Sequence, residues 1–509
     1  MAPESARPQR PVFPALLFAA ALAAVLPGLR DLFGGLGGGG AEVAGSLLDL
    51  VVTALVGRIA LALLPPGLPG EHSLGSGESG GLAVTWAASH LLGIVLLPLQ
   101  VALFAQLGLG SSTLALTLPW LLLGALRAAT LPGDMVPRHG LAVAGARSLV
   151  ERLLLALVVA LSLAPLALHL VHGTLIVPGT LGAFGTPVLA NASPTASPLV
   201  GLACLPALAL LVHHGLVALG LACWLRLAAT LLLVATPWSL AAALTAGGVL
   251  GTDSLEPATA LSAIVPALPR AQLAFGAGTA LAIPALVRAD RRAASLSMLG
   301  LVSLAWLAPV TLPAAGPALA GAGLVTLLLV APGGLRARLS KQLAGALFVG
   351  LAAGLALLAA SLPTTPTDVA PAGAFDSLRG LLGGYELGTF GLVFALVDAA
   401  WIIALFQRPW REAPSRKPRP ALLFLFVLAL LSLLTCMLGE LLLEQLFPEL
   451  GARFALALPE LLLLFLPGGV LLLAAVAGEL GARSEASAVG GETPTNRSTV
   501  GDGAHGAPR

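Results

Sequence analysis

Long apolar runs, most of them about 20 residues in length, alternate with short polar connections along the chain. A bilayer core about 30 Å thick needs about 20 residues of helix, so each run predicts one transmembrane helix. Lipid offers exposed backbone no hydrogen-bond partner, which favours helices throughout. The pattern predicts an all-α, polytopic integral membrane helix bundle with about 14 transmembrane helices. The predicted segments are 11–29, 44–66, 81–107, 112–131, 149–172, 198–223, 227–250, 271–288, 295–313, 315–334, 343–363, 380–406, 421–446 and 455–478.

The run from 198 to 250 is too long for a single span, and we divide it at residues 224–226 because Arg226 marks a membrane boundary. The longest polar stretches are the tail after about residue 479 and short loops. The predicted organisation is therefore a cytoplasmic N-terminal segment, a transmembrane helix bundle and a disordered cytoplasmic tail, at 1–10, 11–478 and 479–509.

The composition agrees with this architecture. Hydrophobic residues make up 57% of the chain and charged residues 10%, against about 25% charged in soluble domains. The mean hydropathy is +0.97. A net charge of +2 predicts no nucleic-acid partner. Cys204, Cys223 and Cys436 lie inside apolar runs without metal or disulfide spacing, so we expect buried thiols that pack as small hydrophobes.

The basic residues predict the orientation, because cytoplasmic loops retain Lys and Arg during insertion. Counting alternate loops from an inner N-terminus places 21 of the 26 basic residues inside and four outside, with Arg58 in a span. Both termini are therefore predicted to be cytoplasmic. The Ala, Leu, Gly and Arg bias, with only two Lys, favours a bacterial source. We expect a multi-pass protein of the cell inner (cytoplasmic) membrane, in contact with membrane lipids.

Ionisable residues at membrane depth are costly and are candidates for function. Asp49 and Arg58 share the second span on opposite faces, so they cannot pair directly, and Arg58 is expected to extend to the interface or to pair with another helix. His213 and His214 suggest a proton relay, but a neutral imidazole bonded to a neighbouring hydroxyl or carbonyl is favoured. The same reading applies to His90.

Asp398 lies deep in the twelfth predicted span, where a hydrogen bond to a neighbouring helix is expected. The third outer loop, 173–197, contains no charged residue. An enzyme acting outside the membrane through a general base or a metal–phosphate contact would have to use other outer-loop carboxylates. The candidates are Asp31, Glu42, Asp253, Glu256, Asp368 and Asp376.

Four stretches resemble bacterial multi-span glycosyltransferases of the GT-C class, the relatives of protein mannosyltransferases and lipid A aminoarabinose transferases. The first, GESGGLAVTWAASHLLG, enters the third span, and the second is a span that ends at an outer acidic residue. The third is a Gly-Ala helix that reaches a basic loop, and the fourth is a C-terminal portion. The stretches are 77–93, 236–261, 273–292 and 385–411.

The resemblance implies transfer of a sugar from a polyprenyl-phosphate donor to a lipid or glycan outside the membrane. It implies Asp253 as the catalytic base, with Glu256 beside it and Asp31 or Glu42 as substitutes. No cofactor is expected, and a divalent metal is left open.

The chain departs from the family's pattern in two respects. Family members carry a catalytic Asp in an outer loop, and residues 173–197 have neither Asp nor Trp. The family's donor-binding Lys near the inward-sloping helix is also unmatched. Either the active carboxylate lies elsewhere, with Asp253 best placed, or transfer activity is lost. Two other classes stay open: a multi-span transporter or lipid flippase, and a non-catalytic membrane scaffold.

Overall fold

The structure is a computed structural model, and the fold is given for the part of the chain that it describes. This part comprises residues 39–64, 82–106, 113–130, 149–163, 200–201, 203–247, 268–307, 315–337, 339–340, 389–407, 419–446 and 458–490.

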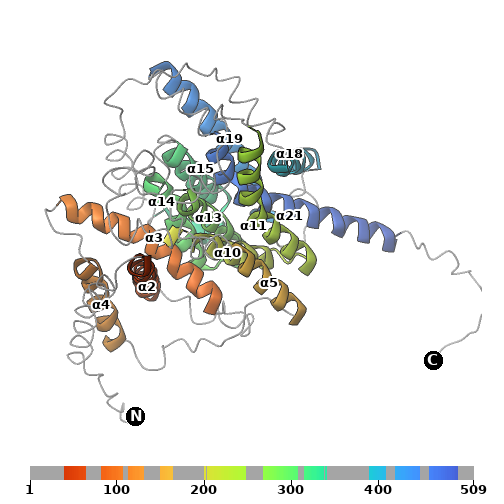
Figure 1. The fold of residues 1–509 in the computed structure, drawn as a ribbon. Coiled ribbons are helices and arrows are strands. Elements are labelled where there is room, and N and C mark those ends of the chain that lie inside the picture. The colour runs from red at the N-terminus through yellow and green to blue at the C-terminus, as the bar shows by residue number, and fades with distance from the viewer. Residues whose placement is uncertain are drawn as a thin grey trace, which may run out of the picture.

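The described residues form an all-helical fold without strands (Figure 1). Every helix coincides with a predicted apolar segment, so the helical reading of twelve segments is confirmed. The predicted segments 11–29 and 343–363 lie outside the described residues. The helices are α2 Gly39–Leu63, α3 Leu82–Gln106, α4 Thr113–Thr130, α5 Leu149–Ser162, α10 Cys204–Ala218, α11 Cys223–Gly247, α13 Leu268–Arg288, α14 Arg291–Leu307, α15 Ala315–Val330, α18 Thr389–Gln407, α19 Arg419–Leu446 and α21 Leu458–Gly490.

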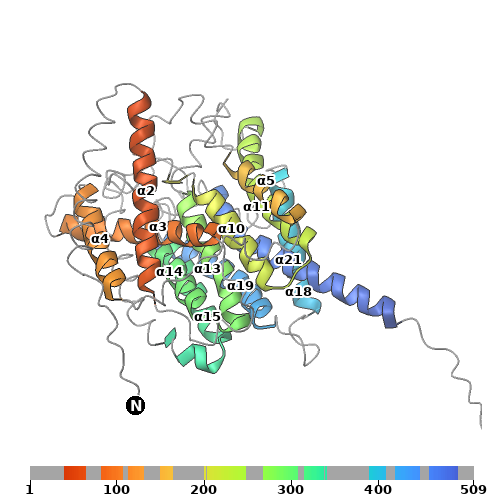
Figure 2. The ribbon, with the colours of Figure 1, turned by 90° about the horizontal axis from the view of Figure 1, so that it is seen from below.

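Several helix ends differ from the predicted ones by a few residues, and two of these differences change the interpretation of the sequence. The break between α10 and α11 comes before Cys223 rather than at Arg226, because Gly220 adopts a φ of +73° that ends the helix earlier. The last helix, α21, continues to Gly490, so the first part of the predicted tail is helical. Both views show α21 extending away from the other helices (Figures 1 and 2).

Three of the described helices are long and apolar enough to cross a membrane. The qualifying stretches are Ala83–Val101 of α3, Arg270–Arg288 of α13 and Leu464–Ala482 of α21. Several other helices are equally apolar but shorter, among them Cys204–Ala218. Length and hydropathy alone therefore make the described part compatible with a membrane protein.

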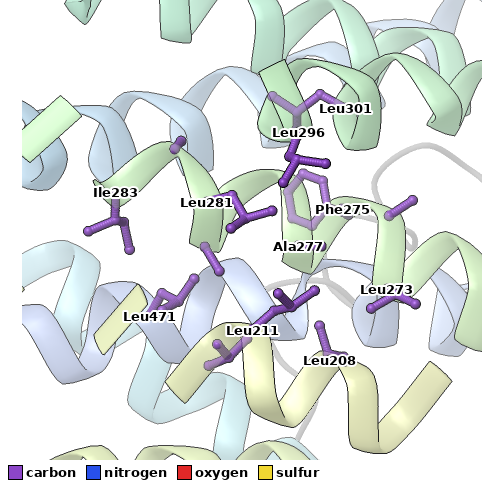
Figure 3. Close-up of a cluster of buried hydrophobic side chains, with 14 of the residues drawn as sticks. Leu208, Leu211, Leu273, Phe275, Ala277, Leu281, Ile283, Leu296, Leu301 and Leu471 are labelled. Atoms are coloured by element: carbon purple, nitrogen blue, oxygen red, sulfur yellow. The ribbon is translucent and has the colours of Figure 1, made fainter. Parts of the chain in front are cut away.

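α13 lies at the centre of the described fold, with α10, α14 and α21 packed around it (Figure 1). Its sequence is rich in Gly and Ala, so neighbouring helices can approach its backbone closely. Gly276 faces Leu208 of α10 and Pro467 of α21. On another side Gly278 faces Leu301 of α14, and Figure 3 shows the leucine side chains that fill the space between these helices.

α2 crosses α3 at a steep angle, since α2 is seen end-on in Figure 1 while α3 lies across the view. The crossing has no room for side chains on the facing surfaces. A Cβ on Gly57 would overlap the carbonyl of Ser89, and one on Gly93 would overlap the carbonyl of Thr53. Glycine is therefore required at both positions for this approach.

Polar side chains are turned inward and large apolar ones outward on several helices. On α5, Glu151 is 1% exposed whereas Leu153 is 62% exposed. On α18, Phe406 is 79% exposed. Water-soluble helices show the reverse distribution, with the apolar stripe facing the core. The described surface therefore suits an apolar solvent.

Candidate functional site

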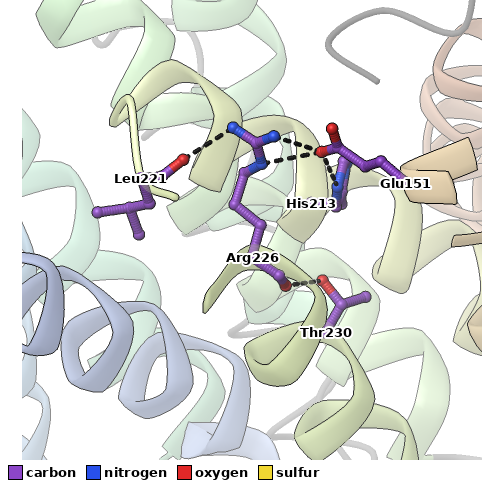
Figure 4. Close-up of polar contacts among 5 residues, drawn as sticks. All are labelled: Glu151, His213, Leu221, Arg226 and Thr230. Carbon is purple, nitrogen blue, oxygen red and sulfur yellow. Dashed lines mark hydrogen bonds and ion pairs between the residues drawn. The ribbon is translucent and has the colours of Figure 1, made fainter. Parts of the chain in front are cut away.

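Three helices place ionisable side chains in contact inside the fold. Glu151 lies in the first turn of α5, His213 near the middle of α10, and Arg226 in the first turn of α11. All three side chains are buried. We call this group the Glu151–His213–Arg226 cluster, and Figure 4 shows it.

Arg226 is the centre of the cluster. Its Nε donates a hydrogen bond to Glu151 Oε1 at 3.1 Å, and its Nη2 donates a second, short one to the same oxygen. Its Nη1 donates to the carbonyl oxygen of Leu221 at 2.8 Å, across the turn that joins α10 to α11. The hydroxyl of Thr230 donates to the Arg226 carbonyl at 2.7 Å. The Glu151 carboxylate and the Leu221 carbonyl therefore hold the guanidinium from two sides.

His213 lies close to Glu151, but its Nε2 forms no hydrogen bond with it. Its Nε2 lies 3.7 Å from Glu151 Oε1 and forms no hydrogen bond. The ionic partner beside this imidazole is a carboxylate, and no described hydroxyl or carbonyl bonds to its Nε2, so the expected bond of that kind stays a prediction. The thiol of Cys223, the first residue of α11, also lies beside Glu151 and Arg226.

The cluster is costly unless it stays complete. Removing two charges from water costs several kcal/mol each, and their attraction offsets this only with good geometry and further hydrogen bonds. Glu151 is well placed in a first helical turn, where the helix dipole favours an acid, whereas Arg226 is not. Glu151 and the Leu221 carbonyl compensate Arg226. The arrangement can fasten three helices, and its imidazole can carry a proton beside a carboxylate.

Glu151 is not among the carboxylates predicted from the sequence, because all of those lie in outer loops. The available signal was positional. Glu151 precedes Arg152 at the start of an apolar run, and Arg226 stands at a break in another, so both belong to loops that the charge pattern placed inside. An acid and a base at the same membrane boundary are candidates for pairing.

A second polar contact joins α3 to the start of α10. His90 Nε2 lies 3.1 Å from the carbonyl oxygen of Val200, which confirms the expectation that this imidazole is satisfied by a carbonyl. Cys204 is buried, as expected, and its Sγ lies 3.7 Å from His90 Nε2 and 3.3 Å from the same carbonyl. Cys223 is only half-buried, contrary to that expectation, because it lies at the exposed start of α11. Trp86 stacks on the imidazole with ring centroids 5.7 Å apart.

The other ionisable residues predicted at membrane depth differ in their burial. Asp49 is buried and Arg58 is exposed, so the two lie on opposite faces of α2, as predicted. Asp398 of α18 is half-buried and forms no hydrogen bond with another described residue, so the expected bond to a neighbouring helix stays a prediction. Among the described residues no three His, Cys, Asp or Glu side chains gather as a metal site.

The carboxylates that the resemblance singled out are not placed by this structure. Asp31, Asp253 and Glu256 lie outside the described residues. Glu42 falls in the first turns of α2, with its side chain outside the described part.

Comparison with known proteins yields no match: no family model, no curated protein and no solved structure is similar to this chain. Function therefore has to be argued from the residues and their arrangement.

Proposed function

We propose that the chain is a multi-pass integral membrane protein of the inner membrane with both termini in the cytoplasm. The inverted distribution of side chains carries this proposal. Leu153 and Phe406 are largely exposed, which costs free energy in water and none in lipid, while the charged Glu151 and Arg226 are buried against each other. An exposed face of this kind contacts acyl chains.

Two contacts support the proposed topology. Glu151 and Arg226 belong to loop ends that the charge pattern assigns to the cytoplasmic side, and they touch. Arg292, at the start of α14, donates a hydrogen bond to the carbonyl of Leu61 at the end of α2, and both ends are likewise assigned inside. Loop ends on one side of a membrane can meet in this way.

Reporter fusions test the topology. A reporter fused after residue 415 should be cytoplasmic, and one inserted near residue 190 should be external. Labelling of a cysteine at position 416 by an impermeant reagent added from outside would overturn the topology, because the densest group of basic residues would then lie on the wrong side.

As its activity, we propose transfer of a sugar from a polyprenyl-phosphate donor to a lipid or glycan at the outer face. The four family-like stretches support this proposal. Asp253 follows a span and precedes a Leu and a Pro, as an outer acid does in that family, and Glu256 would raise its basicity by like-charge repulsion. The carboxylate would accept the proton of the acceptor hydroxyl while the lipid phosphate leaves.

Replacement of the base tests this activity. Asp253→Asn is nearly isosteric but cannot accept the proton, so glycolipid or glycan modification in the host should stop while membrane abundance is unchanged. If modification persists there but stops in Asp31→Asn or Glu42→Gln, the base lies in the first outer loop. If no carboxylate matters while deletion of the protein does, the transferase proposal fails.

The Glu151–His213–Arg226 cluster favours a second candidate, a proton-linked transporter or lipid flippase, because buried ionisable groups in a membrane bundle mark such pathways. His213 Nε2 forms no hydrogen bond, so His213→Gln should remove the protonatable imidazole at little cost to folding. Loss of function in His213→Gln with function intact in Asp253→Asn would support transport. Function intact in both variants would support a scaffold.

A further inference from the structure

Arginines from three helices gather where α2, α13 and α14 end or begin. Arg58 lies near the end of α2, Arg288 is the last residue of α13, and Arg291 and Arg292 open α14. Arg58 and Arg288 are exposed, and the other two are half-buried. Between α13 and α14 the chain turns sharply at Ala289, whose φ is +56°.

Arg292 connects α14 to α2 but is not fully satisfied. Its Nη2 donates to the carbonyl oxygen of Leu61 at 2.6 Å. Its Nε is buried and has no hydrogen-bond partner. Arg58 lies close enough for its positive charge to act on Arg292. Two like charges from separate helices are thus held together, with one donor unused.

The acid nearest to Arg292 is already engaged. Asp290 Oδ1 accepts hydrogen bonds from the backbone N–H groups of Arg292 and Ala293, at 2.9 and 3.0 Å, and so caps the start of α14. It balances part of the Arg292 charge. Among the described residues, no salt bridge joins an acid to Arg58 or Arg292. Within the described part of the chain, the positive charge of Arg58 and Arg292 is therefore left without an acidic partner that could neutralise it.

We propose that Arg58 and Arg292 bind a phosphate group, supplied by the head group of an anionic phospholipid at the cytoplasmic leaflet. A guanidinium matches the geometry of phosphate oxygens, and basic pockets between helices on the cytoplasmic side bind such head groups. The exposed Arg58 would meet the head group at the interface, and the half-buried guanidinium of Arg292, held in place by the Leu61 carbonyl, would supply a fixed second charge. The assignment to the cytoplasmic leaflet rests on the proposed membrane topology.

The test measures lipid retained by the full-length chain purified in detergent, by native mass spectrometry with phosphatidylglycerol or phosphatidylcholine added. Phosphatidylglycerol should bind in preference, and Arg58→Gln or Arg292→Gln should each weaken its binding about fivefold. Arg336→Gln is the matched control, because Arg336 is also exposed, donates to a backbone carbonyl and loses the same charge. It should bind as the wild type does.

Arg58→Gln is the decisive variant, since no hydrogen bond joins its side chain to another described residue, whereas Arg292→Gln also breaks the bond to Leu61. Unchanged phosphatidylglycerol binding in Arg58→Gln, or equal weakening in Arg336→Gln, would overturn the site. If inorganic phosphate at equal concentration displaces the lipid, the site binds free phosphate rather than a head group, and the lipid assignment is overturned. Carbonate extraction of host membranes tests membrane placement separately.

Discussion

Loss of the Glu151 charge should destabilise the fold more than any other conservative change among the described side chains. In Glu151→Gln, Arg226 keeps the Leu221 carbonyl but loses the carboxylate that accepts two of its hydrogen bonds. An uncompensated buried charge costs about 3–5 kcal/mol. At about 2 °C per kcal/mol, the Tm should fall by about 5–10 °C.

The measurement is the fraction of protein that stays monodisperse on size-exclusion chromatography after heating in detergent. Asp398→Asn is the control, because that carboxyl is half-buried and forms no hydrogen bond with a described residue, so its Tm should change little. The double variant Glu151→Leu with Arg226→Leu should regain or exceed the wild-type Tm, since apolar residues replace a buried pair at no loss. The reasoning is refuted if Glu151→Gln melts like the wild type, or if the double variant melts as low as the single one.

Three further changes have definite expected outcomes. Arg58→Leu should leave membrane yield unchanged or raise it, because the exposed arginine has no salt bridge to a described residue; a collapse in yield would reveal an acidic partner. Gly93→Leu should sharply reduce the yield of folded protein, since even a Cβ would overlap the Thr53 carbonyl, whereas normal yield would contradict the close crossing of α2 and α3. His90→Leu should cost only about 1 kcal/mol by thermal unfolding, because the Val200 carbonyl keeps a thiol donor; a loss of folding would show a larger role for the imidazole.

The positions of the helices follow from the sequence because hydropathy is a local property. Each described helix falls at an apolar run, and α3 and α13 match their predicted spans to within a few residues. Ends were less predictable. Gly220 ends α10 early through its backbone conformation, and the polar composition after residue 478 did not reveal that α21 continues to Gly490.

The opposite faces of Asp49 and Arg58 also followed from the sequence, because nine positions along one helix set their relative angle. The partners of these side chains on other helices did not follow from the sequence. Glu151 and Arg226 are 75 positions apart, and nothing in the surrounding leucine and alanine indicates which helix packs beside which. Helical segments of similar hydropathy are interchangeable as neighbours until side-chain shape and a buried charge select one arrangement. The tertiary structure alone decided that α5 meets the start of α11, and that Arg292 meets the end of α2.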